Sequence, residues 1–280
     1  MDTRCARLRY GGQTAPLRKA PDVPIDVTWL GHSTVVLDID GVRIVADPML
    51  RRHAGVLRRR GRKPERAAWT EADAVLLSHL HHDHAEVRSL RLLEGVPILT
   101  APENAEWATR KGLVAPELEP DEWIPAGSAD RGVSVRLVPA VHGARPMPHR
   151  PNAANGHLVR GPSGAVWVAG DTELYPDLEL FSSWAGAPIE LALVPIAGWG
   201  PRLSEGHLDP QEAAKACRMV GARWVIPVHW NTFYMPTTDM WPGGWMWRPG
   251  PAFVKALAHE APTCRPLLLD LGESVRIPAA

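Results

Sequence analysis

The sequence predicts an α/β protein in which two mixed β-sheets pack face to face between outer layers of helices, an αββα sandwich. Short apolar β-rich stretches alternate with helical stretches in two broad halves of the chain, an order typical of helices that cover sheets. The 280 residues are 45% apolar and 22% charged, the composition of an ordinary globular domain. We therefore expect one domain over residues 25–280, preceded by an extended arm over the Gly-, Pro- and Arg-rich residues 1–24.

The first half of the chain predicts five strands and two helices. Asp40-Gly41 is a strong short-hairpin turn between two of the strands. One helix, at 85–93, would begin at Asp83 as its N-cap and end at Gly95, and the other, at 102–111, carries Pro102 near its first turn. The strands are expected at residues 26–30, 33–39, 42–46, 74–77 and 96–100.

The second half repeats this alternation. Asp209 and Pro210 form a typical helix start, as N-cap and first helical residue, for a helix that runs through Met219. A further helix is expected at 252–259. The strands are expected at residues 133–139, 156–160, 165–169, 191–196, 224–228 and 266–271.

A loop rich in metal-binding side chains follows the predicted strand at 74–77. Within it, His79, His81, Asp83 and His84 fit the pattern H-x-H-x-D-H. Residues two apart in extended backbone point the same way, so His79 and His81 can reach one ion together. A helix start at Asp83 would turn Asp83 and His84 toward a second ion. Imidazole nitrogens and carboxylate oxygens suit borderline divalent metals, so the loop predicts a metal site rather than a histidine-rich surface loop.

Similar residues stand at the ends of other predicted strands. Asp47 ends the strand at 42–46, and His142, Asp171 and His229 follow three strands of the second half. Each would be presented from a strand terminus, as the loop at 78–84 is.

Together these motifs resemble the ordered metal motifs of the metallo-β-lactamase superfamily, over roughly residues 26–271. The stretches at 31–34, 47–48, 206–210 and 228–233 resemble the branch that includes N-acyl-phosphatidylethanolamine-hydrolysing phospholipase D and L-ascorbate-6-phosphate lactonase. The resemblance implies the αββα fold of that superfamily and two divalent ions. Zinc is the expected metal, and manganese or iron would suit the same ligands.

The resemblance also implies roles for individual residues. One ion would be held by His79, His81 and His142, the other by Asp83, His84 and His229, with Asp171 bridging them. A hydroxide shared by the two ions would be the nucleophile, and the positive site would favour anionic substrates.

Three residues are expected to act in catalysis. Asp83 does so as a metal ligand. Asp47 would accept the free N–H of a ligand histidine, or only cap a turn before Pro48. His207 would contact the substrate or protonate its leaving group, or only precede a helix.

The other histidines are expected to have no such role. His32 follows a glycine in a hairpin and reads as structural, and His82 as a non-ligand. The remaining four are expected to be solvated or satisfied locally: His53, His149, His157 and His259.

Two segments fit no motif. The basic residues 51–63 read as a solvated loop, or else as a patch that attracts an anionic substrate. The Trp- and Met-rich loop at 236–250 reads as buried core, a hydrophobic lip over the site or a contact between subunits of a homo-oligomer.

These observations favour a dinuclear hydrolase that attacks a phosphodiester in a small-molecule or lipid-like anionic substrate. One alternative is hydrolysis of a lactone or another carbonyl ester by the same site, and another is a non-catalytic metal-binding or sensing protein. Nucleic acid is not expected as a substrate, because the chain has no long insertion of the kind that nuclease branches use, and only the segment 51–63 favours it.

The three cysteines are few and far apart, which indicates a reducing compartment rather than a disulfide framework. No run approaches the roughly 18 apolar residues of a membrane span, and the amino terminus does not read as a secretory signal. We therefore expect a cytoplasmic protein.

Overall fold

The structure is a computed structural model that describes residues 25–119, 121–143, 150–151, 153–236 and 244–278. The predicted arm at 1–24 lies outside the described residues, as do residues 237–243 of the Trp-rich loop.

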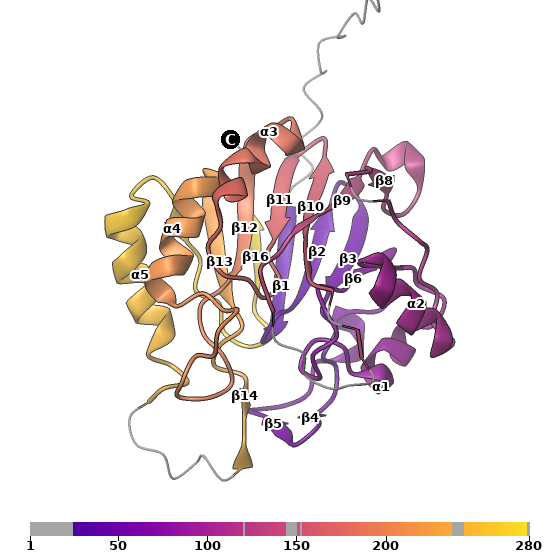
Figure 1. The fold of residues 1–280 in the computed structure, drawn as a ribbon, viewed down its shortest axis with the longest axis horizontal. Coiled ribbons are helices and arrows are strands. Elements are labelled where there is room, and N and C mark those ends of the chain that lie inside the picture. The colour runs from indigo at the N-terminus through magenta and orange to yellow at the C-terminus, as the bar shows by residue number, and fades with distance from the viewer. Residues whose placement is uncertain (1–24, 120, 144–149, 152, 237–243, 279–280) are drawn as a thin grey trace, which may run out of the picture.

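Two mixed β-sheets face each other between layers of helices, which confirms the predicted αββα sandwich (Figure 1). The first sheet has the order β16-β1-β2-β3-β6-β7, with the bounds β16 (Ser274–Ile277), β1 (Ile25–Gly31), β2 (Thr34–Ile39), β3 (Val42–Ala46), β6 (Ala74–Leu76) and β7 (Ile98–Leu99). The second has the order β15-β13-β12-β11-β10-β9-β8, with the bounds β15 (Arg265–Pro266), β13 (Trp224–Val228), β12 (Ile189–Pro195), β11 (Gly164–Val168), β10 (Asn155–Gly161), β9 (Ser134–Pro139) and β8 (Ile124–Pro125).

The helices lie on the two outer sides of this pair (Figure 1). α1 (Val87–Leu90) and α2 (Pro102–Arg110) lie on the side of the first sheet, and α3 (Phe181–Ala185), α4 (Pro210–Val220) and α5 (Pro249–Glu260) on the side of the second. A small third sheet at one end of the molecule consists of β4 (His53–Ala54), β5 (Leu57–Arg59) and β14 (Phe233–Tyr234).

Alternation along the strands explains why the sheets are covered on both faces. In β2, Val35 and Leu37 belong to the larger core, which includes residues of both sheets, whereas Val36 belongs to the smaller core shared with α1 and α2. Ile44 and Val45 divide in the same way in β3. Successive side chains of a strand point to opposite faces, so strands that are apolar on both faces need a helix layer as well as a second sheet.

Parallel pairing brings the predicted strand-end residues to common edges. β3 runs parallel to β6, so Asp47 and the loop after Leu76 leave the first sheet on one side. In the second sheet β11, β12 and β13 are parallel, so Asp171 and His229 leave it together. A backbone hydrogen bond joins the two edges: the N–H of Asn155, at the start of β10 in the second sheet, donates to the carbonyl of Ser78, just after β6 in the first, at 3.0 Å.

Two predicted elements differ from the structure. The helix expected at 85–93 is one α-helical turn, α1, followed by a 3₁₀ turn at Arg91–Leu93, and its N-cap is Glu86 rather than Asp83. The strand expected at 266–271 is only the two residues of β15, and the last strand, β16, pairs antiparallel with β1 instead. By contrast, Asp209 is the predicted N-cap of α4, and it forms a capping box with Glu212.

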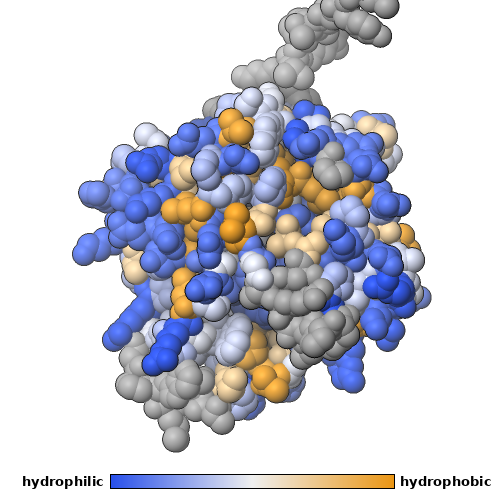
Figure 2. All heavy atoms as spheres, in the orientation of Figure 1, coloured by the Kyte–Doolittle hydropathy of each residue, from blue (hydrophilic) through white to orange (hydrophobic). Residues whose placement is uncertain are grey.

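Figure 2 shows that hydrophilic side chains cover much of the face seen in this orientation, with apolar side chains in smaller groups among them. Among the described residues, no helix combines the length and the apolar character that crossing a membrane requires. The cytoplasmic location stays a prediction.

Candidate metal centre

The structure brings all seven predicted metal ligands together, and Asp47 and His207 lie beside them. Possible ligand atoms here form three overlapping groups, within each of which every atom lies within 4.8 Å of the others. We call one the inner group, consisting of His32, Asp83, His84 and His229, and another the outer group, consisting of His79, His81, His142 and Asp171. The third takes Asp171 and His229 from these two groups and adds His207.

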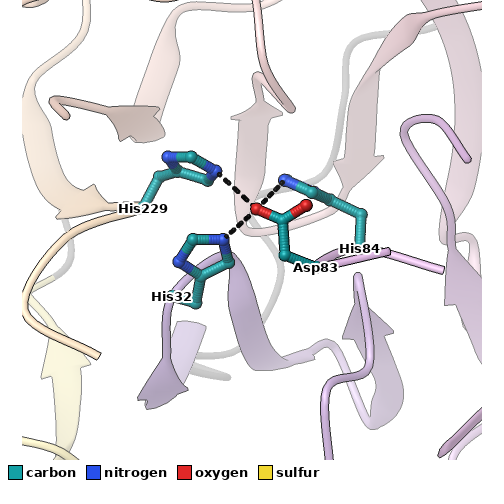
Figure 3. A group of neighbouring side chains, drawn as sticks. All are labelled: His32, Asp83, His84 and His229. Atoms are coloured by element: carbon teal, nitrogen blue, oxygen red, sulfur yellow. Dashed lines mark hydrogen bonds and ion pairs between the residues drawn. The ribbon is translucent and has the colours of Figure 1, made fainter. Parts of the chain in front are cut away.

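The inner group is completely buried, and the carboxylate of Asp83 lies at its middle (Figure 3). Asp83 Oδ2 lies 2.9 Å from His32 Nε2 and 3.5 Å from His229 Nε2. The same oxygen lies 3.9 Å from His84 Nε2. Three imidazoles from different parts of the chain therefore converge on one carboxylate oxygen.

The outer group is more open, because His81 is only half-buried. His81 Nδ1 lies 2.9 Å from His142 Nε2. The ring of His79 lies 4.4 Å from that of His81 and 4.6 Å from that of His142, centroid to centroid.

Asp171 faces both groups. Its Oδ2 lies 3.1 Å from His84 Nε2 and 3.2 Å from His229 Nε2 in the inner group, and 3.8 Å from His79 Nε2 in the outer group. The preceding Gly170 has a φ of +65°, and a Cβ there would lie 2.6 Å from the Cβ of Ser78. Only glycine therefore allows the chain to pass this close to the ligand loop.

Hydrogen bonds on the far side of the rings set their orientation. The Nδ1 atoms of His84, His142 and His229 lie 2.8, 2.7 and 2.7 Å from an oxygen of Asp47, Gly206 and Ala197 respectively. Each Nδ1 must carry the proton to donate to its oxygen, so each Nε2 presents a lone pair toward the centre.

Asp47 also acts on His79, through Ser78. The Ser78 hydroxyl donates to Asp47 Oδ2 at 2.7 Å and lies 2.9 Å from His79 Nδ1. The Ser78 amide donates to Asp47 Oδ1 at 2.8 Å. Both oxygens of this carboxylate are thus occupied, which favours the orienting role over a turn-capping one.

The centre fits a bound cation, because several of its buried polar atoms have no hydrogen bond. These are Nε2 of His79, His84 and His229 and both carboxylate oxygens of Asp171. Unpaired buried polar groups are costly, and a metal would satisfy all of them at once. The donor set of imidazole nitrogens and carboxylate oxygens suits zinc, manganese or iron.

Electrostatics in the centre also favours positive charge. Burial alone would raise the pKa of the Asp171 carboxyl, but His229 and His84 lower it by more, so the pKa lies well below its usual range. Burial lowers the pKa of His84, but Asp171 and Asp47 raise it well above the usual value. Both shifts favour positive charge beside the two carboxylates, and a bound cation would supply it.

His207 lies at the boundary of the two groups. Its Nε2 is 3.3 Å from Asp171 Oδ2, and its Nδ1 is 3.2 and 3.1 Å from the carbonyls of Ser204 and Glu205. Burial lowers its pKa, but the Asp171 carboxylate raises it to about 9. The ring therefore holds a proton at neutral pH, and nearby divalent cations would lower this pKa.

A pocket of about 400 Å³ opens onto the centre and is lined by His81, Asp83 and His207. Its other side is largely apolar and carries Val56, Leu57 and Trp199, of which Val56 and Trp199 are exposed. A substrate in this pocket would meet the ligands on one side and apolar side chains on the other.

Sequence reasoning missed His32, which it read as structural. The side chain is 1% exposed and belongs to the inner group. The signal available was its place in the stretch at 31–34, which the resemblance already included.

For the other histidines, the prediction is confirmed where the structure describes them, whereas for the basic segment it is wrong at one residue, Arg59. His53 and His259 are exposed as expected, and His149 lies outside the described residues. His157 is satisfied rather than solvated: it is fully buried, with Nε2 3.0 Å from the carbonyl of Leu99 and 3.1 Å from the side-chain nitrogen of Asn155. Arg59, in the segment expected to be a solvated loop, is 3% exposed and donates to the carbonyl of Leu30 at 2.7 Å.

Comparison with known proteins gives the same family on independent grounds. Residues 42–230 match the Beta-lactamase superfamily domain. The chain is 28% identical over 216 residues to a UPF0173 metal-dependent hydrolase of Pyrobaculum neutrophilum, covering 77% of this chain and 88% of the relative. It is also 28% identical over 240 residues to N-acyl-phosphatidylethanolamine-hydrolyzing phospholipase D 1 of Caenorhabditis elegans, covering 76% of this chain and 65% of the relative.

A solved structure supports the fold. The metallo hydrolase from the hyperthermophilic archaeon Ignicoccus hospitalis superposes with a TM-score of 0.71 at 20% identity, covering 92% of this chain and 100% of that one. Fold, ligand order and sequence match agree, and the chain belongs to the metallo-β-lactamase superfamily of metal-dependent hydrolases.

Proposed function

We propose that this protein is a dinuclear metal-dependent phosphodiesterase. The observation that carries the proposal is the pair of ligand groups with Asp171 between them, in which the buried Nε2 atoms of His79, His84 and His229 and both oxygens of Asp171 have no hydrogen bond. A single structural ion would leave one group unused, and a closed structural zinc site needs only four ligands.

One ion would be held by His79, His81 and His142, and the other by Asp83, His84 and His229, with Asp171 shared. His32 is close enough to the second set to support Asp83. Bound ions would polarise the phosphoryl oxygen of the substrate and activate a water molecule.

His207 is the proposed proton donor to the leaving group. It lines the pocket, and its Nε2 faces Asp171. Its Nδ1 is held by two backbone carbonyls, which directs Nε2 toward the proposed ions, where the protonated ring would donate to the leaving oxygen.

The preference for a phosphodiester rests on the relative from Caenorhabditis elegans, whose name states hydrolysis of a phospholipid. A second candidate is hydrolysis of a lactone or another carbonyl ester. The apolar wall formed by Val56, Leu57 and Trp199 supports it, because such a wall would also accept an uncharged ester.

The test is hydrolysis of an aryl phosphodiester beside an aryl ester and a lactone, by protein reconstituted separately with zinc, manganese and iron. Asp83→Ala should abolish turnover, whereas Asp130→Ala, at an exposed aspartate that precedes β9 and so lies at the end of that strand opposite His142, should not. Turnover of the lactone alone would favour the second candidate. Activity that survives in Asp83→Ala would contradict the proposed centre.

A further inference from the structure

A second cavity, of about 750 Å³, lies beside the catalytic pocket, and its lining includes five arginine and lysine side chains. We call it the basic groove and define it by Arg51, Arg52, Lys63, Arg88 and Arg150. Among the described residues that line it, Glu86 is the one carboxylate. Since the whole chain has 31 basic and 31 acidic residues, this local excess does not follow from composition.

The positive charges of the basic groove are little compensated within the described part of the chain. Arg52, Lys63 and Arg88 are exposed and form no ion pair with a described residue. Arg51 forms only a long ion pair, with its Nε 3.8 Å from Glu86 Oε1, and 47% of the Arg51 side chain is exposed. These groups remain available to an anion.

Arg150 forms a fixed part of this surface. It is 7% exposed, and its Nη1 donates to the carbonyls of Leu80 at 2.7 Å and Ala85 at 3.3 Å. Its guanidinium also lies 5.1 Å from the ring of Trp107. Carbonyl and aromatic contacts hold the cation in place without neutralising its charge.

The basic groove adjoins the catalytic pocket, because Gly55 and His82 line both. It also continues away from the metal centre into a cavity of about 990 Å³, which shares Arg52 and Lys63 with it. That cavity adds Arg62, Arg66 and Arg91 against two carboxylates, Glu65 and Glu94. A bound molecule could therefore extend from the metal ligands into a region of positive charge.

We propose that the basic groove binds a phosphate-bearing group at the far end of the substrate, away from the bond that is hydrolysed. The substrate class is a small molecule with an apolar portion against Val56, Leu57 and Trp199 and a phosphate or diphosphate beyond it. This proposal rests on the proposed hydrolase function and narrows its substrate.

A nucleic-acid strand fits the described surface less well. Strand-binding grooves combine positive charge with aromatic side chains on which bases stack. Trp69 is the aromatic residue that lines the far cavity, and it is 5% exposed, too buried to serve as such a platform.

The test compares two 4-nitrophenyl phosphodiesters of hexane-1,6-diol, one with a free hydroxyl at the far end and one with a phosphate monoester there. In the double variant Lys63→Ala, Arg88→Ala, KM for the phosphorylated probe should rise roughly five- to tenfold more than KM for the hydroxyl probe. Arg218→Ala, at an exposed arginine on α4 away from α1 (Figure 1), should change neither. An equal rise for both probes, or no rise, overturns the proposal.

A binding measurement separates failure of this proposal from failure of the proposed function. If neither probe is hydrolysed, the phosphodiesterase function fails, and calorimetric titration of the metal-loaded protein with inorganic pyrophosphate decides about the groove. The metals can bind pyrophosphate as well, so the readout is the loss of affinity in the double variant, expected to be about fivefold. Equal affinity in wild type and variant overturns the proposal, as does tighter binding of single-stranded oligothymidylate that depends on the same two residues.

Discussion

The inner and outer ligand groups differ in burial and in how their histidines are held. The inner group is fully buried, and carboxylates contact its rings directly, Asp83 on His32 and Asp47 on His84. The outer group includes the half-buried His81, which lines the pocket, and its His142 is held by a backbone carbonyl. We infer that the inner group holds its ion more tightly, and that both groups reach the pocket, the inner through Asp83 and the outer through the more exposed His81.

Substitution of Asp171 should have the largest effect, because this residue faces both groups. In Asp171→Ala we expect loss of both ions and a fall in kcat/KM of more than about 100-fold, since residues that only support ligands already give roughly 10- to 100-fold. Metal content by mass spectrometry and the phosphodiesterase assay measure this. A variant that keeps both ions would show that Asp171 is not shared.

Substitution of Asp47 should weaken both groups less severely. Asp47→Asn removes a charged acceptor from His84 and, through Ser78, from His79. We expect each ion to bind about 10- to 100-fold more weakly in competition with a chelator.

Ser78→Ala is the matched variant, because it removes the hydroxyl between Asp47 and His79 and keeps the 2.8 Å contact of Asp47 with His84. The hydroxyl also lies 3.4 Å from His84 Nδ1, a longer contact than its 2.9 Å to His79 Nδ1. The variant should weaken the outer ion and leave the inner ion nearly unchanged. If Ser78→Ala releases the inner ion instead, the two groups are not supported as the hydrogen bonds indicate.

Substitution of Gly206 should weaken metal binding less, and only at the outer group. A Cβ there would lie 2.6 Å from His142 Nδ1, and the φ of Gly206 is +83°. Gly206→Ala should shift His142 and weaken the outer ion, with a loss of about 1 kcal/mol in the free energy of unfolding.

Gly95→Ala is its control, because Gly95 has a φ of +81° with no atom within 4 Å of a Cβ. It should lose similar stability through backbone strain alone and keep both ions. Equal metal loss in the two variants would mean that strain, and not contact with His142, is responsible.

The smallest effect on the centre is expected at His157, which belongs to neither ligand group. Burial lowers its pKa to about 4, below the ordinary 6.5. Between these values the unfolded chain binds a proton that the folded protein does not, so the free energy of unfolding decreases as the pH falls from 6.5 to 4.

His157→Gln should remove up to about 3 kcal/mol of this decrease, measured by urea unfolding of the metal-free protein at several pH values. Metal content at neutral pH should stay the same. An unchanged pH dependence of stability would contradict the assignment of a neutral buried imidazole.

Much of the fold could be predicted, because local patterns specify most of the long strands. The Asp40-Gly41 turn lies in the hairpin between β2 and β3, and Asp209 caps α4 as expected. The pairing of β16 with β1 could not be predicted, because it joins residues about 250 positions apart. The helix start at Asp83 was wrong because the contacts of its carboxylate with His32 and His229 replace a cap.

The site residues could be predicted where several ligands lie close together in the sequence. They were harder to predict where only the tertiary structure places a residue beside the others. The loop at 78–84 has a spacing that indicates a metal site, and His142, Asp171 and His229 stand at strand ends. His32 and the buried Arg59 gave no such signal, because their roles depend on contacts with distant segments. Zinc as the metal and a homo-oligomer through the loop at 236–250 stay predictions.

Two ions should lie at the inner and outer ligand groups, and anomalous X-ray diffraction from crystals of the metal-loaded protein can locate them. We expect two peaks, one within bonding distance of His79, His81 and His142 and the other of Asp83, His84 and His229, with Asp171 within bonding distance of both. A single peak, or peaks away from these side chains, would contradict this arrangement.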